Sequence, residues 1–345
     1  MPVTSNDKTP SSREKIKTSY WVWSVVFFVF ALVLIIFYYH DIKKELLLLK
    51  RVDIYWLAIA ICSQLLTYFF AAIVYRVLLK AYKLERYPDL WELMKATVIS
   101  LFFNQAIPSG GISGSTFIFG FLESYKVSPT DLISLIVVEL MCYYFALEIL
   151  IILLLLAAIF VYKTPQVFIG TLAAGILIFI FLGFIIVFAG RKKFLAKLFE
   201  KMKRIKFIGK NMSLDISQSR GEGSLSFLKK ERIKVMKGTL FQLLMIAADC
   251  LTIYALLRGM GTSPSPYVVV LTFIGTRIIA VLPLSPGSLV VFESSMVFFL
   301  THLGVPVGTA IVVTLLYRLL SFWFPMPVGF MLYRSELKKK DIGIP

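Results

Sequence analysis

Residues 103–114 read Phe-Asn-Gln-Ala-Ile-Pro-Ser-Gly-Gly-Ile-Ser-Gly, and residues 282–293 read Leu-Pro-Leu-Ser-Pro-Gly-Ser-Leu-Val-Val-Phe-Glu. Each stretch interrupts a long apolar segment with a cluster of Pro, Gly and Ser. At bilayer depth, irregular backbone is tolerated only where protein or a water-filled cavity surrounds it. Interrupted apolar segments at corresponding places in two halves of a chain point to the binding site of a transporter. The two breaks therefore predict a membrane protein whose functional site lies at these positions.

The composition indicates the same class. Hydrophobic residues make up 58% of the 345, and charged residues make up 17%, which is less than a soluble domain carries. Residues 20–39 and 54–75 contain no charged residue, and either run is long enough to cross a hydrocarbon core of ~30 Å at ~1.5 Å per residue. No small-residue cleavage site follows the first run, so we expect it to remain as a signal-anchor helix. The predicted fold class is an all-α polytopic membrane protein.

The net charge of +17 raises the question of a nucleic-acid partner. The basic residues gather between the apolar runs, where the positive-inside rule accounts for them, so we expect no nucleic acid to bind. Cys62, Cys142 and Cys250 lie far apart inside hydrophobic runs, and His40 and His302 are isolated. We therefore expect no disulfide framework, no metal site and no other cofactor.

The segment 191–237 carries fifteen Lys and Arg residues against four acidic residues. This excess of positive charge predicts a cytoplasmic segment. Between residues 195 and 205 the apolar side chains recur at helical spacing, which suits an amphipathic helix lying on anionic inner-leaflet lipids. A solvated basic loop is the alternative interpretation.

Working outward from this basic segment gives a complete topology in the plasma membrane. Residues 91–127 must begin and end in the cytoplasm and residues 267–303 must begin and end outside, so the simplest solution is two oppositely oriented re-entrant hairpins. The halves 20–190 and 238–334 then form an inverted repeat within a single integral membrane domain, residues 1–345. A full crossing at either break is the alternative. The remaining parts are a cytoplasmic N-terminus at 1–19, about six full spans at 20–39, 53–79, 131–162, 167–190, 238–257 and 305–333, and a cytoplasmic tail at 335–345.

The breaks also suggest a chemistry. A helix that starts after a Gly-rich break presents unpaired backbone N–H groups and the positive end of its dipole, which attract phosphate. We expect such helix starts at Ile112 and at Ser288. Close helix packing on glycine is the alternative role for these residues. The residues expected to contact an anionic headgroup at the breaks are Asn104, Gln105, Pro108, Ser109, Gly110, Gly111, Ser113, Gly114, Pro286, Gly287 and Ser288.

Charged residues inside the apolar runs form a second set of candidates. Each costs ~2.5–3.5 kcal/mol at a lipid-facing helix centre, so we expect them to face the protein interior and to find partners there. Arg277, Arg318 and Glu293 are expected to take part in headgroup binding, and Glu139, Glu148 and Asp249 in charge relay or pairing. Buried salt bridges that only fix helix packing are the alternative.

At these residues the chain resembles a known family. Residues 103–114 resemble the first signature of the lysylphosphatidylglycerol synthase transmembrane region, also called the flippase-like membrane domain family. Residues 282–293, followed by Gly304-Val-Pro306 and Tyr317-Arg318, resemble its second signature, although Ser285 and Ser288 stand where glycine is common. The resemblance covers about residues 20 to 335.

The resemblance has functional implications. In bifunctional members, a similar domain moves aminoacylated phosphatidylglycerol between leaflets, while a separate soluble domain makes that lipid. Other members stand alone or are fused to polyprenyl-phosphate glycosyltransferases. Because the chain ends at Pro345, we expect a stand-alone member without the soluble synthase domain, to which the transferase name of the family does not carry over.

The resulting hypothesis is a flippase or translocase for a lipid with a phosphate headgroup, either aminoacylated phosphatidylglycerol or a polyprenyl-phosphate-linked lipid. Two alternatives stand beside it. One is an enzyme of lipid modification, of the phosphatidylglycerol lysyltransferase type or acting in lipid-linked glycosyl transfer. The other is a membrane partner of a separate synthase or glycosyltransferase.

Overall fold

The computed structural model of the chain describes residues 52–82, 86–106, 112–162, 164–189, 227–228, 230–281 and 290–341. Residues 52–345 belong to one compact unit. Within the described ranges the chain is helical and contains no strand, which confirms the all-α class. The predicted span 20–39, the basic segment as far as residue 226 and the centres of both breaks lie outside these ranges.

Five helical stretches are long and apolar enough to cross a membrane. Their boundaries agree with the predicted spans to within a few residues, with the exceptions given below. They are α3 (Ile54–Leu79), α6 (Pro129–Phe160), α7 (Gln166–Ala189), α10 (Arg232–Gly259), and α13 (Val307–Arg318) continued through the π-helical turn Leu319–Trp323 into α14 (Pro325–Asp341).

Two predicted boundaries are wrong. Helix α10 begins at Arg232 instead of residue 238, so the last basic residues of the segment 191–237 belong to the helix. Lys and Arg near a helix end can extend their charges to the membrane interface, so they need not end the helix. The predicted helix 305–333 consists of two α-helical segments, and α14 continues to Asp341, beyond the predicted start of the tail.

The breaks separate four shorter helices: α4 (Leu90–Ala106), α5 (Ile112–Glu123), α11 (Pro266–Ala280) and α12 (Val291–His302). At ~1.5 Å per residue, none of them reaches the ~30 Å of a hydrocarbon core. Helix α5 begins at the predicted Ile112. Helix α12 begins at Val291, three residues after the predicted Ser288, and Val290 before it has a φ of 69°. Such a left-handed β-branched residue is rare and turns the chain sharply into the helix.

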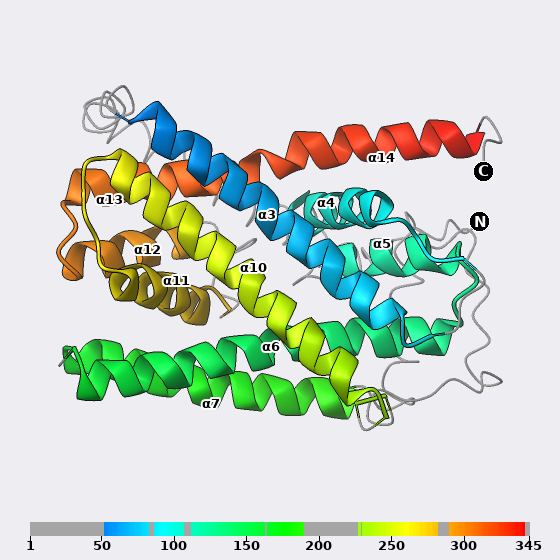
Figure 1. The fold of residues 1–345 in the computed structure, drawn as a ribbon, viewed down its shortest axis with the longest axis horizontal. Coiled ribbons are helices and arrows are strands. Elements are labelled where there is room, and N and C mark those ends of the chain that lie inside the picture. Colours follow the sequence, from blue (N-terminus) through cyan, green and yellow to red (C-terminus); the bar gives the residue numbers. More distant parts are fainter. Residues whose placement is uncertain are drawn as a thin grey trace, which may run out of the picture. The chain divides into compact units, whose positions relative to one another are not determined.

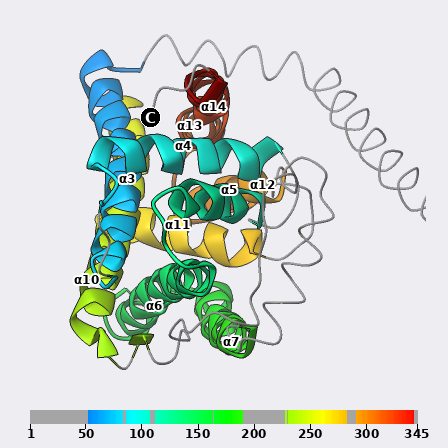
Figure 2. The ribbon, with the colours of Figure 1, turned by 90° about the vertical axis from the view of Figure 1, so that its right-hand side faces the viewer.

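Helices α3 and α10 form the central antiparallel pair of the described unit. At one end, the Asp53 N–H donates to the Gly259 carbonyl at 3.0 Å. At the other end, Gly238 of α10 faces the Leu78 side chain of α3. Figures 1 and 2 show the two helices side by side along their length. Helices α4 and α5 lie toward the end where α3 finishes, and α11 and α12 lie toward the end where α3 starts (Figure 1).

The helices recur at a nearly constant spacing along the chain. Four helices have a counterpart that starts 176 to 179 residues later. The corresponding helices and their first residues are α3 and α10 (Ile54 and Arg232), α4 and α11 (Leu90 and Pro266), α5 and α12 (Ile112 and Val291), and α6 and α13 (Pro129 and Val307). Each half therefore contains a long helix, two short helices and a further helix in the same order. Figure 2 shows the four short helices between α13–α14 on one side and α6–α7 on the other.

Glycine permits the closest helix contacts in the described unit. A Cβ atom at Gly114 of α5 would lie closer than 3.0 Å to Asn104 and to the Ser100 carbonyl of α4. A Cβ atom at Gly275 of α11 would lie equally close to the Phe299 ring of α12. Since lipid tails are as apolar as leucine, such close packing is a main source of helix association in a membrane. Within each pair of short helices, glycine thus fixes how closely the two helices pack.

Candidate functional site

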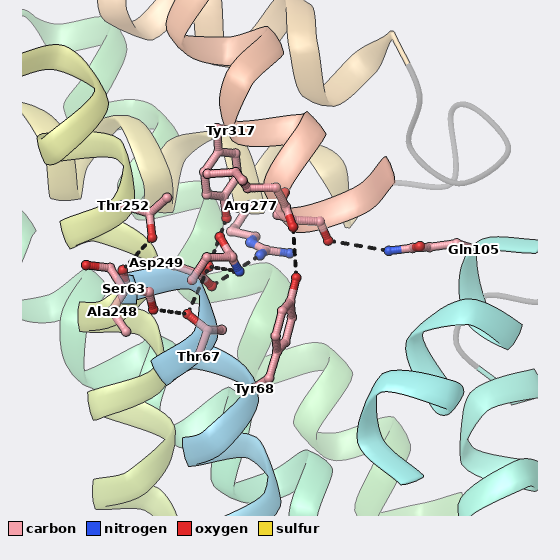
Figure 3. A network of polar contacts seen from close by, with 12 residues as sticks. Ser63, Thr67, Tyr68, Gln105, Ala248, Asp249, Thr252, Arg277 and Tyr317 are labelled. Atoms are coloured by element: carbon pink, nitrogen blue, oxygen red, sulfur yellow. Dashed lines mark hydrogen bonds and ion pairs between the residues drawn. The ribbon is translucent and has the colours of Figure 1, made fainter. Parts of the chain in front are cut away.

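Asp249 lies at the centre of a polar network in which three other helices converge on α10. Its side chain is buried with a relative exposure of 4%. Its Oδ1 accepts hydrogen bonds from the Tyr317 hydroxyl of α13 at 3.2 Å and from Gln64 Nε2 of α3 at 3.4 Å. The Thr67 hydroxyl, 3.5 Å from the same oxygen, is shared with the carbonyl of Ser63. Figure 3 shows the Tyr317 and Thr67 side chains pointing toward the Asp249 carboxylate.

Arg277 is the cationic partner of this carboxylate. Its guanidinium NH2 lies 3.7 Å from Asp249 Oδ2, a long distance for an ion pair. The Arg277 side chain keeps a relative exposure of 34%, and its Nε has no hydrogen-bond partner. It lies in the last turn of α11, where the helix dipole favours a cation. The pair therefore places an incompletely satisfied guanidinium beside the second break.

Arg318 and Glu293 form a second and tighter ion pair. The Arg318 Nε donates to Glu293 Oε1 at 2.6 Å, and the side chains have relative exposures of 8% and 24%. Arg318 NH2 and Glu293 Oε2 each lack a partner. The pair joins the end of α13 to the first turn of α12. Each of the helices that flank the second break, α11 and α12, therefore carries one member of an arginine–carboxylate pair.

The Phe292 ring connects the two arginines. The Arg277 Cζ lies 5.7 Å and the Arg318 Cζ 4.8 Å from its centroid. The Phe292 ring stacks on the Tyr317 ring, with 6.0 Å between the ring centroids and an interplanar angle of 11°. Cations within about 6 Å of an aromatic face are attracted to it, more strongly where water is excluded. Phe292 thus holds both guanidinium groups near one another without neutralising either.

The π-helical turn after α13 supplies two acceptors that link the first half to this site. In an α-helix, the Ser321 carbonyl would accept from residue 325, but Pro325 has no N–H. The Leu320 carbonyl would accept from Phe324, but the Phe324 N–H donates to the Leu319 carbonyl instead, at 2.8 Å. The two freed carbonyls are used by other helices. Leu320 accepts from the Tyr68 hydroxyl at 2.9 Å and Ser321 from Gln105 Nε2 at 3.5 Å (Figure 3).

Asn104 joins the two helices of the first pair. Its Oδ1 accepts from the Gly114 N–H at 2.7 Å, and the Ser113 hydroxyl donates to the Phe103 carbonyl at 2.8 Å. One of the N–H groups expected to face an anion is therefore already taken by Asn104. Together with the close contact at Gly114, this geometry matches the packing alternative for that glycine. Gln105, whose Oε1 has no partner, extends toward the π-helical turn instead.

The structure thus brings together several of the residues singled out from the sequence. It pairs Arg277 with Asp249 and Arg318 with Glu293, and it links Gln105 to the π-helical turn of the second half. Pro108, Ser109, Gly110, Gly111, Pro286, Gly287 and Ser288 lie outside the described residues.

The remaining two acidic residues lie apart from this site. Glu139 hydrogen-bonds Gln242 at 2.9 Å. Glu148 lies beside the exposed face of α6 that carries Phe145 and Ile152. Glu139 and Glu148 are nine residues apart and about half a turn out of phase, so their separate surroundings follow from helix geometry.

Sequence reasoning overlooked the polar residues of α3. Gln64 and Thr67 stand three residues apart in an otherwise apolar helix and are 4% and 8% exposed. Their spacing puts both on one helix face, a signal that would have identified an interior-facing stripe. Phe292 carried no such signal, because an aromatic residue in a membrane helix is ordinary.

These features define a class: a multi-pass α-helical membrane protein with two interrupted helix pairs and charged residues of both signs in its interior. The sequence profile of the lysylphosphatidylglycerol synthase TM region matches residues 21–329, and the chain belongs to that family. A UPF0104 membrane protein of Pyrococcus horikoshii is 23% identical over 323 residues, covering 89% of this chain and 95% of the relative. Another, from Methanothermobacter thermautotrophicus, is 26% identical over 108 residues, covering 31% and 32% of the two chains.

Proposed function

We propose that this protein moves a lipid with a phosphate-bearing, anionic headgroup from one leaflet to the other. The observation that carries the proposal is the state of Arg277. It is a third exposed and has an unpartnered Nε, and it stands beside a buried carboxylate in the interior of the helix bundle. A cation at such a depth is costly and marks a substrate or ion pathway. The family to which the chain belongs is associated with a lipid-modifying synthase, which agrees with a lipid substrate.

The two arginines offer complementary donors to a phosphate. The Arg277 Nε and the Arg318 NH2 are buried and have no partner in the described structure, so the bundle must rearrange for a phosphate to reach them. Guanidinium groups form strong, directed hydrogen bonds to phosphate oxygens. A headgroup between the arginines would gain these bonds. Glu293 would hold the Arg318 guanidinium in place, while the phosphate would compete with Asp249 for Arg277. The acyl tails would stay in the bilayer outside the helix bundle.

The membrane topology that we propose has two re-entrant hairpins. Their support is the shortness of α4, α5, α11 and α12, the recurrence of four helices after 176 to 179 residues, and the antiparallel course of α3 and α10. An inverted repeat combines these three features. One hairpin would open to the cytoplasm and the other to the outside, with both termini cytoplasmic and the protein in the plasma membrane.

The basic segment 191–237 would then lie on anionic inner-leaflet lipids. There it can collect the substrate near the cytoplasmic entrance. A synthase or glycosyltransferase is the proposed partner, because a translocase does not itself make the lipid that it moves.

The test is lipid movement by the full chain reconstituted in liposomes. Fluorescent phosphatidylglycerol in the inner leaflet is protected from a membrane-impermeant quencher until it is moved outward. We expect Arg277→Gln and Arg318→Gln to reduce the rate at least tenfold, since each removes a charge-assisted hydrogen bond worth about 1.5–3 kcal/mol.

Lys95→Gln is the matched control. Lys95 forms a 3.2 Å ion pair with Glu336 between α4 and α14, remote from the two arginines, so its loss removes a cation without touching the site. Equal rates in folded wild-type, Arg277→Gln and Arg318→Gln proteins would refute the proposal. Lipid extraction after expression distinguishes the enzymatic alternative, because a synthase or transferase creates a new lipid species and a translocase does not.

A further inference from the structure

A second polar cluster lies in the bundle, on the side where α6 and α10 begin. Glu139 of α6 accepts a hydrogen bond from Gln242 Nε2 of α10 at 2.9 Å. Tyr75 of α3 interacts electrostatically with the same carboxyl group. The cluster therefore joins the central α3–α10 pair to α6, and neither of the arginines takes part in it.

Glu139 has only neutral neighbours among the described residues. It belongs to none of the ion pairs found there. An ionised carboxylate without a cationic partner is costly at membrane depth, whereas a protonated carboxyl group is a modest polar group. The titratable groups around it are Tyr75 from α3 and Cys142, Tyr143 and Tyr144 from its own helix, and α10 contributes the amide of Gln242.

Gln242 can serve both protonation states of Glu139. Its side chain is 1% exposed, and its Oε1 has no partner while its Nε2 donates to the carboxylate. An amide donates through its nitrogen to a carboxylate and accepts through its oxygen from a carboxylic acid. A rotation of the amide is therefore sufficient to satisfy Glu139 before and after it binds a proton.

This cluster is electrostatically connected to the arginine site. Gln242 and Asp249 are seven residues apart on α10, which is about 10 Å along the helix. Tyr143, one turn from Glu139, interacts electrostatically with Arg277, Asp249 and Glu139. Charges about 10 Å apart interact appreciably where the effective dielectric constant is low, so a change of charge at one cluster can act on the other.

Building on the function proposed above, we propose that Glu139 is a proton-binding site and that one proton travels with each monoanionic headgroup. When a phosphate takes over Arg277, the negative charge of Asp249 is no longer compensated. This extra negative charge makes the ionised form of Glu139 still less favourable, so it shifts the equilibrium of Glu139 from the carboxylate toward the proton-bound carboxylic acid. Headgroup and proton then add no net charge to the bundle, and the proton leaves Glu139 when the headgroup is released.

The proton site can be tested without any transport. Infrared difference spectra of the purified full chain, recorded on titration with acid, report protonation as the carbonyl stretch of a carboxylic acid. We expect a band that is absent from Glu139→Gln and present in Glu148→Gln, the matched control on the same helix. Glutamine retains the volume and hydrogen-bonding capacity at position 139. If Glu139→Gln loses no band, the proton site is refuted.

Coupling is tested in liposomes with fluorescent phosphatidylglycerol and an imposed pH gradient. We expect a gradient with the lipid donor side acidic to accelerate wild-type and Glu148→Gln transport severalfold, and to have no effect on Glu139→Gln. A pH response in Glu139→Gln equal to that of the wild type would overturn the coupling. If the wild type moves no lipid, the proposed function fails, while the infrared titration still decides whether Glu139 binds a proton.

Discussion

Replacing Asp249 by Asn should tighten lipid binding. This prediction distinguishes an Arg277 that binds the headgroup from an Arg277 that only stabilises the helix packing. In the proposed mechanism the lipid phosphate competes with Asp249 for Arg277. Asparagine keeps an oxygen that accepts from Tyr317 and Gln64, so the network of hydrogen bonds is retained while the negative charge is removed. The substitution therefore weakens the attraction of residue 249 for Arg277 but keeps the hydrogen bonds that position this part of the bundle.

The size of the effect follows from the geometry of the ion pair. Unit charges about 4 Å apart attract by about 1 kcal/mol in water and about 4 kcal/mol at an effective dielectric constant near 20. The Arg277–Asp249 distance is 3.7 Å, and the arginine is a third exposed while the aspartate is buried. An intermediate value of about 2 kcal/mol corresponds to roughly thirtyfold tighter binding. Since the pair is long at 3.7 Å and the Arg277 side chain is not fully buried, the loss of stability should stay below the ~3–5 kcal/mol typical of a broken buried pair.

The assay is displacement of a fluorescent phosphatidylglycerol from the full chain in neutral detergent micelles. Arg277→Gln should weaken binding at least tenfold, and adding Asp249→Asn to Arg277→Gln should have no further effect, because the two residues act through one interaction. Thermal unfolding of each variant shows whether it is folded. If Asp249→Asn weakens binding as much as Arg277→Gln does, the pair is only a packing element and the reasoning fails.

Three further predictions concern packing and topology. Gly114→Ala should lower the free energy of unfolding by about 1–3 kcal/mol, because the added Cβ would clash with α4. Gly120→Ala is the control and should not change this free energy, because no atom lies within 4 Å of a Cβ at that position. Thermal unfolding in detergent compares the two variants. Tyr68→Phe should cost about 1 kcal/mol in the same measurement, because it leaves a carbonyl of the π-helical turn without its donor. Ser124→Cys and Ser263→Cys, in a background without the native cysteines, should react with an impermeant maleimide from opposite sides of a vesicle, and labelling from the same side would contradict the arrangement of α3 and α10.

The sequence was sufficient to predict the long helices of the described unit. Uncharged runs of membrane length identify such helices directly, because their backbone must be satisfied internally. The helix starts at Ser128-Pro129 and Ser265-Pro266 also follow local rules, since serine caps the first turn and proline fits the first helical position. The π-helical turn was missed, although Pro325 lies inside the predicted helix 305–333 and removes a hydrogen bond there.

The pairing of charges could not be predicted from the sequence. Gln242 and Asp249 are seven residues apart on α10, which places them on one helix face, and both are buried. Which base meets Asp249 depends on the rotation and depth of α11 relative to α10, and periodicity within one helix contains no information on either. The sequence offers four acidic residues as partners for two arginines, and only the packed structure selects Asp249 and Glu293.

The two pairs differ in a way that assigns them different tasks. Arg318 is 8% exposed and contacts Glu293 at 2.6 Å, whereas Arg277 is 34% exposed and contacts Asp249 at 3.7 Å. A short, buried pair is costly to break because it leaves an uncompensated charge, and a long, accessible pair exchanges partners more easily. Arg318 is therefore suited to a fixed positive charge that attracts the headgroup, and Arg277 to the donor that changes partners. In the proposed mechanism, the weak Asp249 pair competes with the headgroup phosphate for Arg277, which favours release of the lipid and therefore turnover.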